Sequence, residues 1–189
     1  MENINFNELK ERAYQIACEH GWHDEEYSLF HMMMLVITEL GEAVNADRNN
    51  NFADRVMFEK NFDLPNTKTE YHFITCFDVF IKDTVEDELA DAVIRLLDMA
   101  GHVDYDIDSS EFTDEQFDIG SVEIIGKQTF PEQLFSFIYI IAQKDCTITC
   151  MIYMLFLIAH HNKIDLLWHV EQKMKYNAMR PYKHGLKKY

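Results

Sequence analysis

Two short acidic motifs carry most of the chemistry that this sequence offers. The segment "ELGE" holds Glu39 and Glu42, and the segment "ELAD" holds Glu88 and Asp91. Each pair is spaced i, i+3, so on a helix both carboxylates project from one face. One such pair is usually a solvated helix surface, but both pairs here stand among apolar residues. Burying four neighbouring carboxylates without a cation would raise their pKa values steeply.

A hard divalent cation is the partner that these residue types favour. Carboxylates that project inward from two facing helices suit Mg²⁺, with Mn²⁺ as a substitute. Few basic residues lie on the two segments, and Arg95 is the nearest to the second pair. The sequence therefore predicts a magnesium site, provided that the two helices pack together. Small residues would allow a close approach of the backbones: Gly41, Ala43, Ala90 and Ala92.

The C-terminal segment carries the opposite charge. The whole chain has a formal net charge of −16, from 17 basic and 33 acidic residues, yet residues 173–189 contain no acidic residue. Lys173, Asn177 and Arg180 follow an i, i+4, i+7 spacing, which would place them on one helix face as a phosphate clamp. The alternative is a solvated basic helix end that complements the helix dipole. The acidic remainder of the chain makes a nucleic-acid polymer an unsuitable partner.

These segments together resemble the MazG-like superfamily of all-α nucleoside triphosphate pyrophosphohydrolases, in its phage and bacterial branch. The resemblance is carried by "ELGE", by "DTVEDELADAVIRLLDMAG" and by the tail "KMKYNAMRPYKHGLKKY", and it covers about half of the chain. It implies Mg²⁺-dependent hydrolysis of a (deoxy)nucleoside triphosphate to the monophosphate and pyrophosphate, in nucleotide-pool house-cleaning. It also implies assembly into a homodimer or homotetramer.

The resemblance assigns roles to individual residues. It implies that the catalytic metal ligands are Glu39, Glu42, Glu88 and Asp91. It implies that the triphosphate is held by Lys173, Asn177 and Arg180, with Tyr176 beside the base. Glu86 is a further candidate for orienting the attacking water.

Three features depart from the compact family pattern. The two acidic motifs are separated by residues 43–87, which requires an insertion around 48–70. Thr38 stands where many relatives carry another acid, so the number of metal ions stays open. The segment 102–130 has no counterpart in a minimal helical core.

The pattern of apolar residues predicts an all-α chain, and its length predicts one domain, 1–189. The resemblance implies a helical bundle of the pyrophosphohydrolase type, with the two inserted segments. Five or six helices are expected, over about 5–19, 23–50, 71–101, 131–143, 147–161 and 164–179. A short strand before Lys82 is an alternative, because that stretch is rich in Phe and β-branched residues. Trp22, near the start of the second helix, could line a base pocket; core packing or helix capping explains it equally well.

The location of the protein is predicted from its cysteines and its hydropathy. Four cysteines without a CxxC pair favour a reducing cytoplasm, and the N-terminus has no signal pattern. The most apolar run, "CTITCMIYMLFLIA", is shorter than the roughly 20 residues of a spanning helix. We therefore expect a cytoplasmic protein without a membrane partner.

Two other functions compete with the hydrolase. The chain could be a non-catalytic oligomerisation or partner-binding module that keeps the family fold. A carboxylate-bridged di-iron bundle is the second alternative, but it requires Glu-x-x-His motifs. Glu42 and Asp91 stand where those histidines would be.

Overall fold

All regular elements in the described part of the chain are helices. The computed structural model describes residues 5–62, 69–110, 112–143, 146–186 and 188. The helices in these ranges are α1 (Phe6–Glu19), α2 (Leu29–Arg48), α3 (Arg55–Phe62), α4 (Glu70–Phe80), α5 (Val85–His102), α6 (Asp114–Gly120), the π-helix η1 (Ser121–Ile125), α7 (Phe130–Ile141), α8 (Ile148–His161), α9 (Leu166–Ala178) and the short α10 (Lys183–Leu186). The all-α prediction is confirmed, and the alternative strand before Lys82 is wrong because α4 occupies that stretch.

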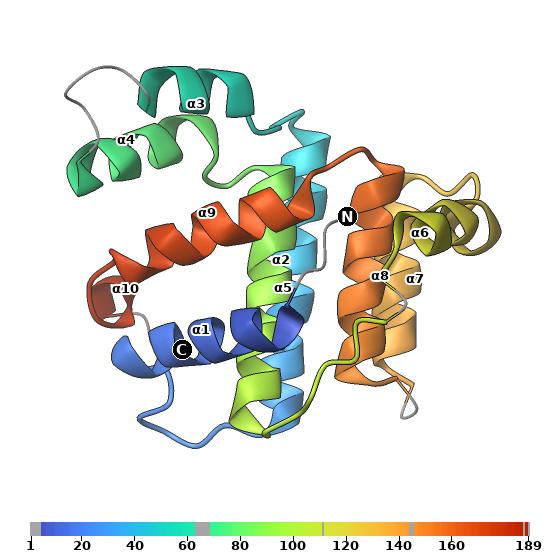
Figure 1. The fold of residues 1–189 in the computed structure, drawn as a ribbon, viewed down its shortest axis with the longest axis horizontal. Coiled ribbons are helices and arrows are strands. Elements are labelled where there is room, and N and C mark those ends of the chain that lie inside the picture. Colours follow the sequence, from blue (N-terminus) through green and yellow to red (C-terminus); the bar gives the residue numbers. More distant parts are fainter. Residues whose placement is uncertain (1–4, 63–68, 111, 144–145, 187, 189) are drawn as a thin grey trace.

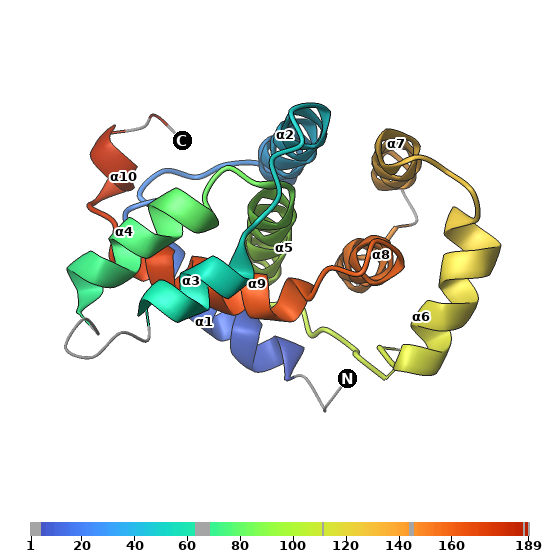
Figure 2. The ribbon, with the colours of Figure 1, turned by 90° about the horizontal axis from the view of Figure 1, so that it is seen from above.

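Helices α2 and α5, which carry the two acidic motifs, pack along each other at the centre of the molecule (Figure 1). Viewed from above, α2, α5, α7 and α8 are seen end-on, and α1 and α9 run across α5 (Figure 2). Leu40 and Ala43 of α2 and Ala90 and Val93 of α5 are fully buried in the main core. The expected close packing of the motif helices is therefore present.

Gly41 does not contribute to that packing. It is exposed, and apart from its chain neighbours and its own helix backbone no atom lies within 4 Å of the position that a Cβ would occupy. The expectation that Gly41 makes room for the facing helix is wrong, because the residue lies on the outer side of α2. The small residues that do lie in the core are Ala43, Ala90 and Ala92.

The single helix expected over 71–101 is two helices, α4 and α5. Helix α4 ends at Phe80, and Asp83 then takes a left-handed backbone conformation with φ of 60°. The Thr84 hydroxyl accepts a hydrogen bond from the amide of Asp87, which caps the start of α5. The polar residues Lys82, Asp83 and Thr84 interrupt the apolar pattern at this boundary, a signal that the prediction did not use.

Helix α2 also begins later than the sequence pattern predicts. Its first residue is Leu29, and the Ser28 hydroxyl accepts a hydrogen bond from the amide of His31. The acidic residues 24–26 therefore lie in the loop that precedes the helix, not in its first turn. Ser28 is the N-cap of α2. The predicted helix began at residue 23 because acidic residues favour the first turn of a helix.

The two inserted segments contain helices of their own. The segment 48–70 contributes α3, which pairs with α4, and α4 packs on α9 (Figure 1); residues 63–68 lie outside the described ranges. This pair forms a second apolar cluster around Phe58, Phe73, Phe77 and Tyr176. The segment 102–130 contributes α6 and η1, which pack on α8.

Within the described ranges, α2 is the one helix long and apolar enough to cross a membrane by length and composition alone. Buried helices of soluble proteins meet the same criterion, and α2 packs on α5 and α7 here. The apolar helix α8 has only 14 residues, and most of them are buried, as predicted for a core helix.

Candidate metal centre

Three carboxylates from the two central helices converge. Glu39 and Glu42 of α2 and Glu88 of α5 each offer one oxygen, and these oxygens lie within 4.8 Å of one another. Glu39 and Glu88 are buried, with 7% and 5% of their surface exposed, and Glu42 is exposed. The group therefore opens to solvent on the side of Glu42, as a site for an incoming ligand requires.

The environment of these carboxylates disfavours their charged forms. Burial, together with the nearby charges of Asp91 and Asp87, raises the pKa of Glu88 to about 9. Burial and the charge of Asp91 also raise the pKa of Glu39, although Arg95 opposes this rise. A divalent cation would reverse the effect, since it stabilises ionised oxygens directly. The donor set, all carboxylate oxygen, fits Mg²⁺ or Mn²⁺.

Arg95 neutralises one side of the group. Its Nε donates to Glu39 Oε1 at 2.8 Å, across the contact between α5 and α2. The sequence placed Arg95 next to the second acidic pair. In the folded chain, its partner is the first pair.

Asp91, the fourth expected ligand, lies beside the group rather than in it. Its Oδ2 forms an ion pair with Lys173 Nζ at 2.8 Å. Asp91 still raises the pKa of both Glu39 and Glu88, so its charge acts on the same site. The structure thus brings three of the four motif carboxylates together and pairs the fourth with a lysine.

Asp87 is the residue at this site that sequence reasoning missed. It is 1% exposed, and its Oδ2 accepts hydrogen bonds from Lys173 Nζ at 2.7 Å and from the Asp83 amide at 3.0 Å. Its Oδ1 is buried, and no partner for it occurs among the described residues. Burial raises the pKa of Asp87, and Lys173 limits that rise. Asp83, Asp87 and Glu88 form a second acidic group, in which one oxygen of each residue lies within 4.8 Å of the others. Glu88 belongs to both groups.

The sequence did contain a signal for Asp87. It lies four residues before Asp91, so both carboxylates project from the same face of a helix. It also stands three residues after Thr84, the spacing at which a capping residue meets the first turn. The prediction relied on the i, i+3 spacing of the acidic motifs, which selects Glu88 and Asp91 but not Asp87.

The residues of the predicted phosphate clamp lie in three different environments. Lys173 is 4% exposed and faces the carboxylates of α5. Asn177 is buried, and its Oδ1 has no partner within the described ranges. Arg180 lies beyond the end of α9 at Ala178, with its guanidinium 5.6 Å from the centre of the Tyr176 ring. The prediction of one shared helix face is wrong for Arg180, because Pro181 disfavours helical backbone at the residue before it.

Tyr176 is engaged within the second apolar cluster. Its ring stacks on Phe77 at a centroid distance of 4.3 Å, and its hydroxyl donates to Asp78 Oδ1 at 2.7 Å. Burial, followed by this hydrogen bond, raises the pKa of Tyr176 to about 12. The ring therefore joins α9 to α4.

Trp22 lines a narrow pocket that adjoins the metal group through Arg95. The pocket has a cavity volume of about 30 Å³. Its lining residues are Trp22, His23, Tyr27, His31, Met32, Leu35, Arg95, Asp98 and His102. Tyr27 and His31 stack on each other at 4.3 Å, and His23 Nε2 lies 2.7 Å from Asp98 Oδ1. The pocket is thus rich in flat side chains on which a planar group could stack.

The C-terminal residues hold the loop that carries Trp22. The Lys183 amide donates to the carbonyl of His20, and the Tyr182 hydroxyl donates to Asp24. The Tyr182 ring lies where a Cβ of Gly21 would stand, and Gly21 has a φ of +77°. A glycine is required here for both reasons.

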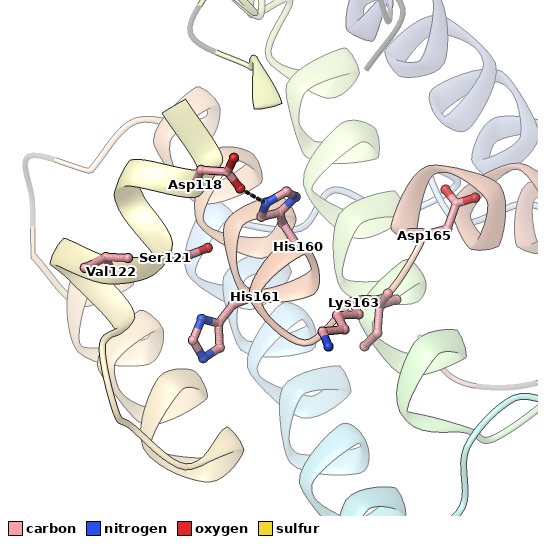
Figure 3. Close-up of a pocket in the computed structure, with 8 residues that line it drawn as sticks. Asp118, Ser121, Val122, His160, His161, Lys163 and Asp165 are labelled. Carbon is pink, nitrogen blue, oxygen red and sulfur yellow. Dashed lines mark hydrogen bonds and ion pairs between the residues drawn. The ribbon is translucent and has the colours of Figure 1, made fainter. Parts of the chain in front are cut away.

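A larger and more open groove, of about 690 Å³, lies between α6, η1 and the junction of α8 with α9 (Figure 3). His160 faces Asp118 across it, with Nε2 2.7 Å from Oδ1, and His161 points away from this pair. The groove shares no lining residue with the carboxylate group. Among the described residues, neither group of three carboxylates that could hold a metal ion contains one of its histidines.

The comparisons with known proteins leave the site to be interpreted from its own chemistry. No family model, no curated protein and no solved structure matches this chain.

Proposed function

We propose that this protein is a magnesium-dependent nucleoside triphosphate pyrophosphohydrolase, with Mn²⁺ as a substitute metal. The observation that carries the proposal is the convergence of Glu39, Glu42 and Glu88 from two packed helices. Burial raises the pKa of Glu88 to about 9, so at neutral pH this carboxyl keeps its proton when no cation is bound. A bound divalent cation would stabilise the ionised form. The resemblance of both motifs and the tail to MazG-like enzymes supports the same function.

The proposed reaction adds water across the bond between the α-phosphorus and the bridging oxygen to the β-phosphorus. The products are the nucleoside monophosphate and pyrophosphate. Bound Mg²⁺ would neutralise phosphate oxygens and so lower their repulsion for the incoming water. Glu39, Glu42 and Glu88 would hold the ion at the solvent-open edge of the α2–α5 contact.

The chain's own residues suggest where the rest of the substrate lies. The pocket of Trp22, Tyr27 and His31 adjoins the carboxylates through Arg95. Its cavity of about 30 Å³ is too small to enclose a nucleobase, so the base would stack on the flat side chains at its mouth. Arg180 is half-buried and could meet the triphosphate as a bidentate donor. Glu86 is less suited to orient water, because its Oε2 already accepts a hydrogen bond from the Ala53 amide at 2.8 Å.

Pyrophosphate release from a panel of ribo- and deoxynucleoside triphosphates, with and without Mg²⁺, tests the proposal. We expect Glu39→Gln, Glu42→Gln and Glu88→Gln each to lower turnover by about 10²-fold or more if the ion is catalytic. Glu123→Gln, an exposed change on η1, is the matched control and should keep full turnover. The hydrolase proposal fails if no nucleotide is turned over and Mg²⁺ leaves the melting temperature unchanged.

The exposed apolar side chains favour a second proposal, self-association into a homodimer or homotetramer. Phe30 and Met34 on α2 and Phe135 and Tyr139 on α7 are each more than half exposed. Helices α2 and α7 pack side by side, so these side chains lie on neighbouring elements. Sedimentation of the wild type and of Phe30→Asp measures whether the chain self-associates and whether the exposed apolar side chains on α2 are needed for it. An oligomer that neither binds Mg²⁺ nor hydrolyses any nucleotide would favour the non-catalytic oligomerisation or partner-binding module.

The proposed location is the cytoplasm, with no membrane partner. None of the four cysteines forms a disulfide, as a reducing compartment would require.

A further inference from the structure

Lys173 is a buried ammonium held between two carboxylates. Its Nζ lies 2.7 Å from Asp87 Oδ2 and 2.8 Å from Asp91 Oδ2. Burial by itself would lower the pKa of Lys173, but the attraction of Asp91 and Asp87 outweighs it and raises the pKa. Lys173 is therefore a permanent cation of the site at any physiological pH.

The surroundings of Lys173 keep it in this position. The rings of Phe77 and Tyr176 lie 5.6 Å and 5.9 Å from Nζ, within the range of cation–π attraction. Asp87 is fixed in turn by the amide of Asp83, at the start of α5. A lysine so enclosed would have to break two short ion pairs before its Nζ could reach a phosphate group.

The charges of the site divide unevenly between its two sides. Five carboxylates gather there: Glu39, Glu42, Asp87, Glu88 and Asp91. Arg95 pairs with Glu39, and Lys173 pairs with both Asp87 and Asp91. Glu42 and Glu88 form no ion pair among the described residues, although the charge of Lys173 opposes the rise in the pKa of Glu88. With all five carboxylates ionised, the two cations leave a formal charge of −3, because one lysine is shared by two aspartates. The part of this charge on Glu42 and Glu88 lies on the side that opens to solvent, where one divalent ion would compensate it.

We propose that Lys173 Nζ takes the place of a second divalent cation, so that the centre binds one ion per chain through Glu39, Glu42 and Glu88. This inference rests on the proposed function for the presence of that ion. Asp91 is then a positioning residue that holds Lys173, not a metal ligand. The fixed charge of Lys173 would lower the local negative potential without occupying the open side, where the triphosphate must enter.

The second acidic group, Asp83, Asp87 and Glu88, is the alternative place for another ion. An ion there would meet the ammonium of Lys173 next to its own ligand Asp87. Lys173 already occupies Asp87 Oδ2, so an ion would have to use the unpartnered Oδ1. The two cations would then share one carboxylate, and their repulsion in a buried site is strong. The geometry thus favours the lysine over a second ion.

Manganese titration of the metal-free full-length chain, followed by the electron paramagnetic resonance of free Mn²⁺, measures the number of bound ions. We expect one Mn²⁺ per wild-type chain. Lys173→Met removes the built-in cation and should raise the number to two, with a larger Mn²⁺-dependent rise in melting temperature. Lys175→Met is the matched control, because this exposed lysine lies on the same helix over the Phe73 ring; it should still bind one.

Two or more ions in the wild type, or a single ion in folded Lys173→Met, would overturn the inference. Asp91→Asn provides an independent test if the lysine variant does not fold. It should still bind one Mn²⁺, because Asp91 is not a ligand, whereas Glu88→Gln should bind at least tenfold more weakly. Loss of the ion in Asp91→Asn would also refute the inference. Absence of any binding to the wild type would instead refute the proposed function.

Discussion

Replacing Glu88 by glutamine should stabilise the metal-free protein, and increasingly so as the pH rises. The carboxyl of Glu88 has its pKa raised from an ordinary value near 4.5 to about 9, chiefly by burial. At pH 7 the folded chain must keep a proton that the unfolded chain has lost. The free energy of unfolding contributed by Glu88 is therefore highest below about pH 4.5 and falls until about pH 9.

The size of this destabilisation by Glu88 follows from the pH range between its unfolded and folded pKa values. Keeping a proton costs about 1.4 kcal/mol for each pH unit above 4.5, which is about 3 kcal/mol at neutral pH. Solvent on the open side beside Glu42 screens the site and lowers the cost to about 2 kcal/mol. A glutamine side chain carries no titrating proton, so this contribution to the pH dependence disappears in Glu88→Gln.

Urea unfolding with a chelator present, at about pH 5.5 and about pH 7.5, measures the effect. Wild type should lose about 2 kcal/mol of unfolding free energy between these pH values relative to Glu88→Gln. Glu123→Gln should follow the wild type. Added Mg²⁺ should stabilise the wild type more than Glu88→Gln, because the variant lacks one ionised ligand and binds the ion more weakly. A difference between wild type and Glu88→Gln that is the same at both pH values would refute the reasoning.

Three smaller changes test the packing and the pocket. Gly41→Ala should raise the free energy of unfolding by about 0.5–1 kcal/mol, measured in urea, since the added methyl meets no atom within 4 Å in an exposed helix interior. Gly101→Ala should instead lower it by at least 1 kcal/mol in the same assay, because the new Cβ would lie 2.5 Å from Tyr14 Cβ. The hydrogen bond to Asp98 raises the pKa of His23, so the stability that this pair supplies is present at low pH and is lost as the pH rises through the pKa of the folded histidine. Asp98→Asn should therefore lower the His23 pKa in an NMR titration and destabilise the protein more at acidic than at basic pH.

The sequence predicted the helical class and the pairing of the two acidic motifs, because both depend on local spacing. The i, i+3 pairs fix which carboxylates share a face, and the apolar residues around them indicate which face is buried. Glu39, Glu42 and Glu88 therefore meet as expected. The boundary between α4 and α5 was missed although Lys82, Asp83 and Thr84 interrupt the apolar pattern and threonine is a helix-capping residue. The left-handed conformation of Asp83 separates the two helices there.

The electrostatic partners could not be predicted in the same way. Lys173 lies 86 residues from Asp87 along the chain, and its contact depends on how α9 crosses α5. A basic tail indicates a positive surface, but spacing alone does not distinguish a lysine that faces solvent from one that faces a buried carboxylate. The same limit applies to Arg95, whose partner Glu39 lies on another helix.

The attachment of the C-terminal residues to the loop after α1 couples two distant parts of the chain. Lys183 and Tyr182 hold His20 and Asp24, and the ring of His20 contacts the Arg180 carbonyl through Nε2. A fluctuation that frees the end of the chain must also release the loop that carries Trp22. The amides of both segments should therefore exchange with solvent deuterium as one cooperative unit, at a rate set by a single opening event. Occupation of the Trp22 pocket would slow the exchange of the loop after α1 and that of the C-terminal residues together.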